Sequence, residues 1–204
     1  MKKYLSALLV YLTVSLSIVN GSTGEVERLN TVIDAAIEAI YGEPYLENTA
    51  EQKQARVRKV IEAEYDLTVI IRRAIGRNWN LMSPPEQERV LELVKQLVVK
   101  AYVSGMNGKD RPVVKLGKLV SVSEKRAEIP STIVLDGQAI KVLYRLGKLQ
   151  SGWQIYDIVA EDISVVSNYR EQIDDHFRKG DGKELISKLE ELLSKENLDE
   201  EINI

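Results

Sequence analysis

One stretch of the chain predicts the fold most directly, and it reads GWQIYDIVAEDISVVSNYREQ (residues 152–172). Residues 153–160 are apolar on both faces of the expected strand, which is typical of a strand that is covered on both sides. A tight turn follows at Asp162, and the pattern then changes to helical spacing from Ile163 to Lys179, before Gly180. This stretch therefore predicts a strand that passes through a turn directly into a helix.

The residues before this stretch change once from helical to strand spacing. Apolar periodicity predicts helices over 26–40, 50–63, 66–75 and 83–104, then strands over 113–122, 126–135, 139–146 and 153–160, and a last helix over 181–193. Asp136-Gly137 is a hairpin turn signal, and the strand links are short. The pattern indicates one α+β domain in which an antiparallel meander of about four strands is covered by amphipathic N- and C-terminal helices.

The N-terminus has the layout of an export signal. Lys2 and Lys3 precede an uncharged apolar run over 4–19, and small residues follow near Gly21. This run is short for a membrane span, so we expect a cleavable signal peptide over 1–21 and a single domain over 22–204. An uncleaved membrane anchor is the alternative interpretation.

Composition excludes several function classes. The chain has no Cys, so disulfides, thiol catalysis and thiolate metal sites are excluded. Loss of Lys2 and Lys3 would leave 26 basic against 31 acidic residues, which changes the net charge from −3 to −5. A mildly acidic protein is not expected to bind nucleic acid. His176, the single His, stands near a predicted helix end, where a surface position is expected, and no His cluster predicts a metal site.

Three segments together carry a family resemblance. They are YDLTVIIRRAIGRNW (65–79), SPPEQERVLELVKQLVVKAY (83–102) and the stretch over 152–172. In this order, and after a signal peptide, they resemble the MlaC family of periplasmic phospholipid shuttles in bacterial outer-membrane lipid transport. Asp162 departs from the family's usual Gly, although Asp tolerates positive φ better than most residues. Val94 is one of several aliphatic residues at positions that are often aromatic in the family.

The resemblance implies a carrier that catalyses no reaction. It implies a periplasmic protein that holds phospholipid as cargo, without a cofactor or metal. Its expected partners are an inner-membrane ABC transporter complex with its lipid-binding subunit and an outer-membrane lipoprotein–porin complex. The headgroup would stay at the pocket mouth. Arg72 and Arg73 could approach a phosphate there, or they could simply be solvated surface charges.

A lipid carrier needs an apolar interior. Exposure of two acyl chains to water costs on the order of 25 kcal/mol, and a pocket of roughly 1,000 Å³ would be needed to cover them. We expect the apolar faces of the strands and helices to line an enclosed pocket, although such stripes also fill ordinary close-packed cores. The predicted lining residues are Leu67, Ile70, Ile71, Ala74, Leu91, Val94, Val98, Ile129, Ile133, Ile140, Val142, Tyr144, Tyr156, Ile158, Ile163 and Val166.

Two other functions compete with this prediction. Asp157 lies within an apolar strand, where it is either a structural ion pair or the raised-pKa acid or base of a small-molecule enzyme on a cone-shaped helix-on-sheet fold. Asp66 has the same two interpretations and could also cap a helix. A periplasmic interaction module or chaperone with a filled core is the third hypothesis.

Overall fold

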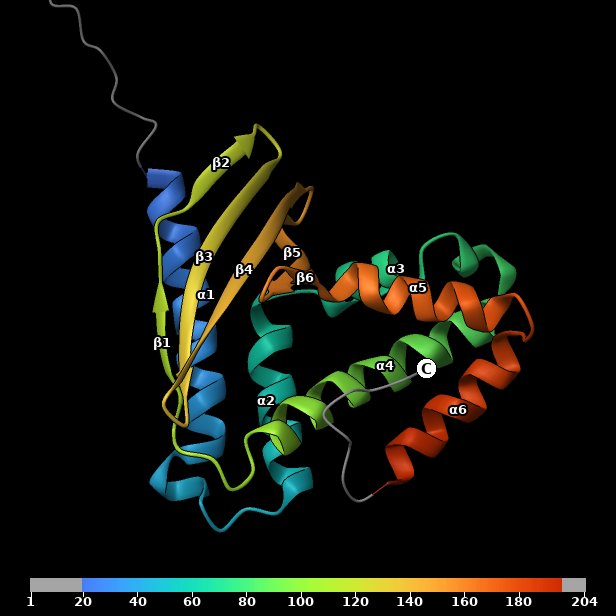
Figure 1. Cartoon of the computed structure of the whole chain (residues 1–204), viewed down its shortest axis with the longest axis horizontal. Coiled ribbons are helices and arrows are strands. Elements are labelled where there is room, and N and C mark those ends of the chain that lie inside the picture. Colours follow the sequence, from blue (N-terminus) through green and yellow to red (C-terminus); the bar gives the residue numbers. More distant parts are fainter. Residues whose placement is uncertain (1–19, 196–204) are drawn as a thin grey trace, which may run out of the picture.

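The computed structural model describes residues 20–195, which form a layer of sheet with its covering helices and a second body of helices beside it (Figure 1). The predicted signal peptide therefore lies almost wholly outside the described residues. Among the residues that are described, no helix combines the length and the apolar character needed to cross a bilayer. The helices are α1 (Asn20–Tyr41), η1 (Glu43–Tyr45), α2 (Ala50–Glu64), α3 (Leu67–Ile75), η2 (Gly76–Leu81), α4 (Pro84–Gly105), α5 (Val165–Phe177) and α6 (Gly182–Ser194).

The sheet is antiparallel and continues as a meander from β3 to β6, which confirms the predicted α+β class. Its order is β1-β3-β4-β5-β6, and β2 also pairs with β3. It has six strands rather than about four. They are β1 (Val113–Leu116), β2 (Val120–Ser123), β3 (Arg126–Leu135), β4 (Gln138–Leu149), β5 (Gly152–Ala160) and β6 (Ile163–Ser164).

The strand predicted over 113–122 is interrupted opposite Pro130 of β3. Gly117 donates its N–H to the Pro130 carbonyl at 2.7 Å, but Pro130 has no N–H to return. A Cβ on Gly117 would lie only 2.8 Å from the Pro130 ring. The missing donor and the close approach of the two backbones end β1 here, and pairing resumes at Val120 with Glu128.

Two hairpin turns set the register of the meander. Asp136 (φ 50°) and Gly137 (φ 79°) connect β3 to β4 as predicted. Glu161 (φ 46°) and Asp162 (φ 67°) connect β5 to β6, also with positive φ at both positions, so Asp162 has a backbone conformation that Gly would adopt without strain. This second hairpin corrects the predicted helix start, because Ile163 and Ser164 pair with β5 before α5 begins.

The helix starts follow their capping residues closely. Thr49 with Gln52, Ser83 with Glu86, and Asp181 with Glu184 form capping boxes at α2, α4 and α6. The Ser164 hydroxyl accepts a hydrogen bond from the Ser167 N–H at the start of α5. These local signals explain why the predicted helix boundaries lie within a few residues of the observed ones, except at α1, which starts at Asn20.

Buried apolar residues form two main clusters. The sheet cluster joins one face of the sheet to α1 and to the end of α2, with Leu29, Val32, Tyr65, Ile129, Val142, Tyr144 and Leu146 at its centre. The helix cluster joins the four helices α3, α4, α5 and α6. At its centre lie Ile71, Ile75, Met82, Val90, Leu93, Leu97, Ile173, Leu185 and Leu189. A smaller cluster around Val57 and Val99 lies between α2 and α4.

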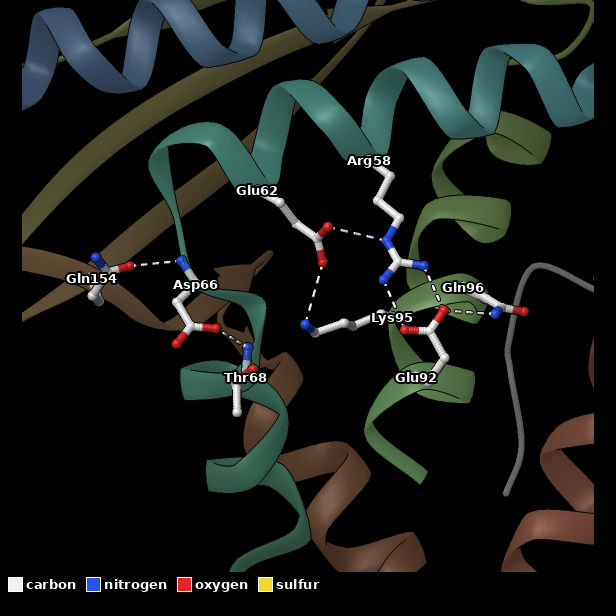
Figure 2. A network of polar contacts seen from close by, with 8 residues as sticks. All are labelled: Arg58, Glu62, Asp66, Thr68, Glu92, Lys95, Gln96 and Gln154. Atoms are coloured by element: carbon white, nitrogen blue, oxygen red, sulfur yellow. Dashed lines mark hydrogen bonds and ion pairs between the residues drawn. The ribbon is translucent and has the colours of Figure 1, made fainter. Parts of the chain in front are cut away.

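A charged network holds α2 to α4 beside this smaller cluster (Figure 2). Arg58 donates to both carboxylate oxygens of Glu92, at 2.6 and 2.8 Å, and to Glu62 at 3.1 Å. Lys95 of α4 pairs with Glu62 at 3.3 Å. The hydrogen bonds from Arg58 hold the pKa of Glu92 down at about 2.

This low pKa predicts an acid-dependent contact between the two helices. Because the folded pKa lies below the unfolded value of about 4.3, Glu92 stabilises the protein above that pH, and the contribution is lost as the pH falls toward 2. Glu92 is partly exposed, so we expect Glu92→Gln to lower the free energy of unfolding by only about 0.5–1 kcal/mol at pH 7. Urea unfolding should show this difference closing in acid. The control Glu88→Gln, on the same helix, should show no difference at either pH.

Candidate functional site

Most of the predicted lining residues belong to one or other of the two main clusters. The sheet cluster contains Ile129, Ile133, Ile140, Val142, Tyr144 and Ile158. The helix cluster contains Leu67, Ile70, Ile71, Leu91 and Val94. Ile129, Ile71, Val142 and Tyr144 are buried at the centres of the clusters, whereas the others are only partly buried. The structure thus divides the predicted lining between two bodies.

The helix α4 has three distinct faces. One packs in the helix cluster through Val90, Leu93 and Leu97, and a second carries Glu92 and Lys95 toward α2. Helical geometry places Leu91, Val94 and Val98 on the third face, together with Tyr102, which lies close to Tyr144 of the sheet. Val98 is 43% exposed on this face. This apolar face of α4 is therefore only partly covered.

Five of the open depressions on the surface of the described residues have volumes of about 530–850 Å³. They are bordered largely by polar and charged side chains, such as Arg58 and Lys100 in the depression between α2, α4 and α6. Only Leu91 and Val142 of the predicted lining border any of the five. None of the five depressions gathers the predicted lining, so the enclosed pocket stays a prediction.

Tyr156 departs from its predicted position because β5 contains a bulge. The pairing with β4 shifts between Arg145 and Leu146, so Ile155 and Ile158 both join the sheet cluster although they are three residues apart. The Tyr156 ring instead lies against Gly147, within 3.3 Å of where a Cβ would stand, and beneath Arg73. Tyr156 is therefore outside the sheet cluster, and strict alternation was the wrong rule for this strand.

The four other predicted lining residues belong to neither of the two main clusters. Ile163 is 63% exposed on β6, and Val98 is exposed on α4, so neither is buried in this structure and their role as lining residues stays a prediction. Val166 is buried at the start of α5, where its N–H donates to Asp157. Ala74 of α3 is partly buried.

Asp157 is a structural carboxylate. It is 4% exposed and accepts hydrogen bonds from Arg145 at 3.1 Å, from the Ser164 hydroxyl at 2.8 and 3.0 Å, and from Val166 N–H at 3.2 Å. Arg145 also pairs with Glu128 at 3.2 Å. These contacts occupy both carboxylate oxygens and join β4, β5 and the N-terminus of α5. They leave Asp157 poorly placed to act as a base.

Asp66 caps a helix. Its carboxylate accepts from Thr68 N–H at 2.8 Å, and its own N–H donates to Gln154 Oε1 of β5 at 2.8 Å (Figure 2). Gln154 is a buried residue that the sequence interpretation missed, although a polar side chain within an apolar strand was the signal for it. The contact attaches the start of α3 to the sheet.

Arg72 and Arg73, the candidate phosphate contacts, each lie over an aromatic ring. Arg72 stacks on Trp79 at 4.7 Å, and Arg73 lies 4.6 Å from the Tyr156 ring centroid.

His176 is buried, whereas a surface position was predicted. Its Nε2 lies 2.9 Å from the Asp181 carbonyl oxygen, and this contact ties α5 to the start of α6. Within residues 20–195 no three His, Asp or Glu side chains converge as metal ligands would.

Comparison with known proteins assigns this chain to a family. The sequence model of the MlaC protein matches residues 30–191, which is most of the chain. The chain belongs to the MlaC family. All three segments that carry the resemblance lie within the matched range. No curated protein sequence matches the chain.

A solved structure shares the fold of this MlaC family member. It is a phospholipid-binding protein from Ralstonia solanacearum, in complex with a phospholipid. The two structures superpose with a TM-score of 0.69 at 21% identity, over 83% of this chain and 98% of the other. The helices that flank the sheet are thus part of a shared architecture.

The role of Asp157 can be tested by an isosteric change. Asp157→Asn leaves Arg145 without its buried partner, so we expect a loss of about 2–4 kcal/mol in the free energy of unfolding. Urea unfolding measures this loss. The control Asp175→Asn removes an exposed pair with Arg178 and should cost about 0.5 kcal/mol or less. An Asp157→Asn protein of undiminished stability would contradict the structural role.

Proposed function

We propose that this protein is a periplasmic phospholipid carrier that shuttles lipid between membranes and catalyses no reaction. The observation that carries the proposal is membership of the MlaC family over residues 30–191. The phospholipid complex of the Ralstonia solanacearum protein with the same fold supports it. The carboxylates of Asp157 and Asp66 already accept structural hydrogen bonds from Arg145 and from the Thr68 N–H, which argues against the competing enzyme hypothesis.

The acyl chains are proposed to lie between the sheet cluster and the third face of α4. Leu91, Val94 and Val98 on one side, and Ile133 and Ile140 on the other, present apolar surface that is not fully covered. The two bodies are connected by polar contacts, such as Gln154 with Asp66 and Arg58 with Glu92, and by the smaller apolar cluster around Val57 and Val99. Separation of the bodies would open room for lipid without breaking either buried centre.

The proposed route of the cargo runs between two membrane complexes. The protein would receive lipid from, or deliver it to, an inner-membrane ABC transporter complex with its lipid-binding subunit and an outer-membrane lipoprotein–porin complex. Export through the signal peptide over 1–21 would bring the carrier to the periplasm.

The export step predicts a defined N-terminus. Protein isolated from the periplasm should begin at Ser22, because small residues precede it and the apolar run ends at Val19. N-terminal sequencing and intact mass identify the site. A mature protein that retains Met1 would support the membrane-anchor alternative instead.

Lipid binding is tested on protein purified without detergent. Native mass spectrometry should show bound phospholipid, and the lipid-free protein should take up labelled phospholipid from vesicles. Val94→Asp places a charge on the proposed lining, so we expect uptake to fall by about tenfold or more. The control Val120→Asp, on the exposed strand β2, should leave uptake unchanged. Lipid-free protein that also fails to take up lipid would overturn the proposal.

A further inference from the structure

Three hydroxyl groups lie within the otherwise apolar sheet cluster. Tyr65, at the C-terminal end of α2, is 3% exposed, and Ser131 of β3 is 7% exposed. Tyr144 of β4 is buried as well. The sequence interpretation assigned a polar role to none of them, because Tyr65 and Tyr144 fit apolar or motif patterns and Ser131 is a single polar residue in a strand.

The register places these groups side by side. Ser131 pairs with Val142, so Tyr144 is its diagonal neighbour on the same face of the sheet. Burial raises the pKa of Tyr144 to about 12, and the nearby Ser131 hydroxyl offsets this only in part. Tyr65 lies close enough to Tyr144 to raise the pKa of Tyr144 slightly further. The three hydroxyls therefore share one region of the interior.

Two of the hydroxyls have a polar neighbour, Arg28 for Tyr65 and Tyr144 for Ser131, but neither pair has well-formed hydrogen-bond geometry. Within residues 20–195, no group meets hydrogen-bond geometry with Tyr65 Oη or Ser131 Oγ, and both atoms are fully buried. Tyr41 shows the usual alternative, since its hydroxyl donates to the Met106 carbonyl at 3.0 Å. Buried polar groups are normally satisfied, so two adjacent exceptions in one apolar cluster point to an acceptor from outside the chain.

We propose that Tyr65, Ser131 and Tyr144 form a hydrogen-bonding site for an acyl ester carbonyl of the bound lipid. This inference rests on the proposed function and names the class of cargo as ester-linked glycerolipids. An ester carbonyl is a neutral acceptor attached directly to an apolar chain. That combination matches hydroxyl donors surrounded by Ile129, Val142 and other aliphatic residues.

A phosphate group fits this region less well. The nearest guanidinium, on Arg28, stacks over the Tyr65 ring at 4.3 Å and donates to the Trp153 carbonyl at 2.5 Å. Glu25 lies 3.4 Å from Arg28, and Glu64 lies 3.9 Å from it. These two carboxylates already compensate the charge of Arg28 and would repel an anionic headgroup.

The test compares two phospholipids that differ only in the linkage. Lipid-free protein is incubated with equal amounts of a diester and a diether phosphatidylglycerol that carry identical chains, and native mass spectrometry measures the bound ratio. Each hydrogen bond to a carbonyl is worth about fivefold, so we expect the diester to be enriched by about fivefold or more. The double variant Tyr65→Phe/Ser131→Ala should reduce the ratio toward one.

Matched controls remove similar hydroxyls elsewhere. Tyr45→Phe, where the ring lies under Arg56, and Ser121→Ala on β2 should keep the diester preference. Equal binding of both lipids by the wild type, or a preference that persists in the double variant, would overturn the inference while leaving lipid binding intact. Binding of neither lipid would overturn the proposed function as well.

A stability measurement distinguishes the lipid from a trapped water. If Ser131 Oγ is unsatisfied in the lipid-free protein, Ser131→Ala should not lower Tm, because it removes a buried polar group without a partner. A fall in Tm of about 2–4 °C would mean that a buried water or the Tyr144 hydroxyl already satisfies Ser131, and it would count against the ester site.

Discussion

The arrangement of sheet and helices depends on one buried carboxylate. A charge in a protein interior is costly unless its oxygens are paired, and Asp157 meets this requirement only when β4, β5 and the start of α5 are all in place. Arg145 is supplied by the neighbouring strand, Ser164 by the hairpin strand, and the Val166 N–H by the helix itself. The direction in which α5 leaves the sheet is thus fixed by electrostatics as much as by packing.

This constraint shapes how the two apolar bodies are joined. The sheet cluster and the helix cluster each have a solid centre, with residues such as Ile129 and Val90 fully buried. Between them lie capping and ion-pair contacts from Asp66, Gln154 and Arg58, together with the smaller apolar cluster around Val57 and Val99. For the proposed lipid carrier such a division would help, because the polar contacts at the seam can be exchanged for water more readily than close-packed side chains can be separated.

The sequence predicted the elements well because their signals are local. Helical periodicity, capping boxes such as Ser83 with Glu86, and the Asp136-Gly137 turn depend only on near neighbours in the chain. The errors arose where a distant residue decides. Pro130 splits the first strand from across the sheet, and the bulge opposite Arg145 turns Tyr156 away from the interior.

The same distinction applies to the candidate site. Apolar spacing identified most members of both clusters, but it could not show that they divide between two bodies, nor that Val98 is exposed. The buried hydroxyls were missed for a related reason. A Ser or Tyr in a strand does not reveal whether a partner will reach it, because the partner comes from another element of the fold.

The two tryptophans divide between the bodies in the same way. Trp79 packs against the helix cluster beneath Arg72, and Trp153 packs in the sheet cluster near Lys148. They are the only tryptophans in the chain. Each body therefore contains its own intrinsic fluorophore, and replacing either one by Phe would let the emission of the other report on a single half of the molecule.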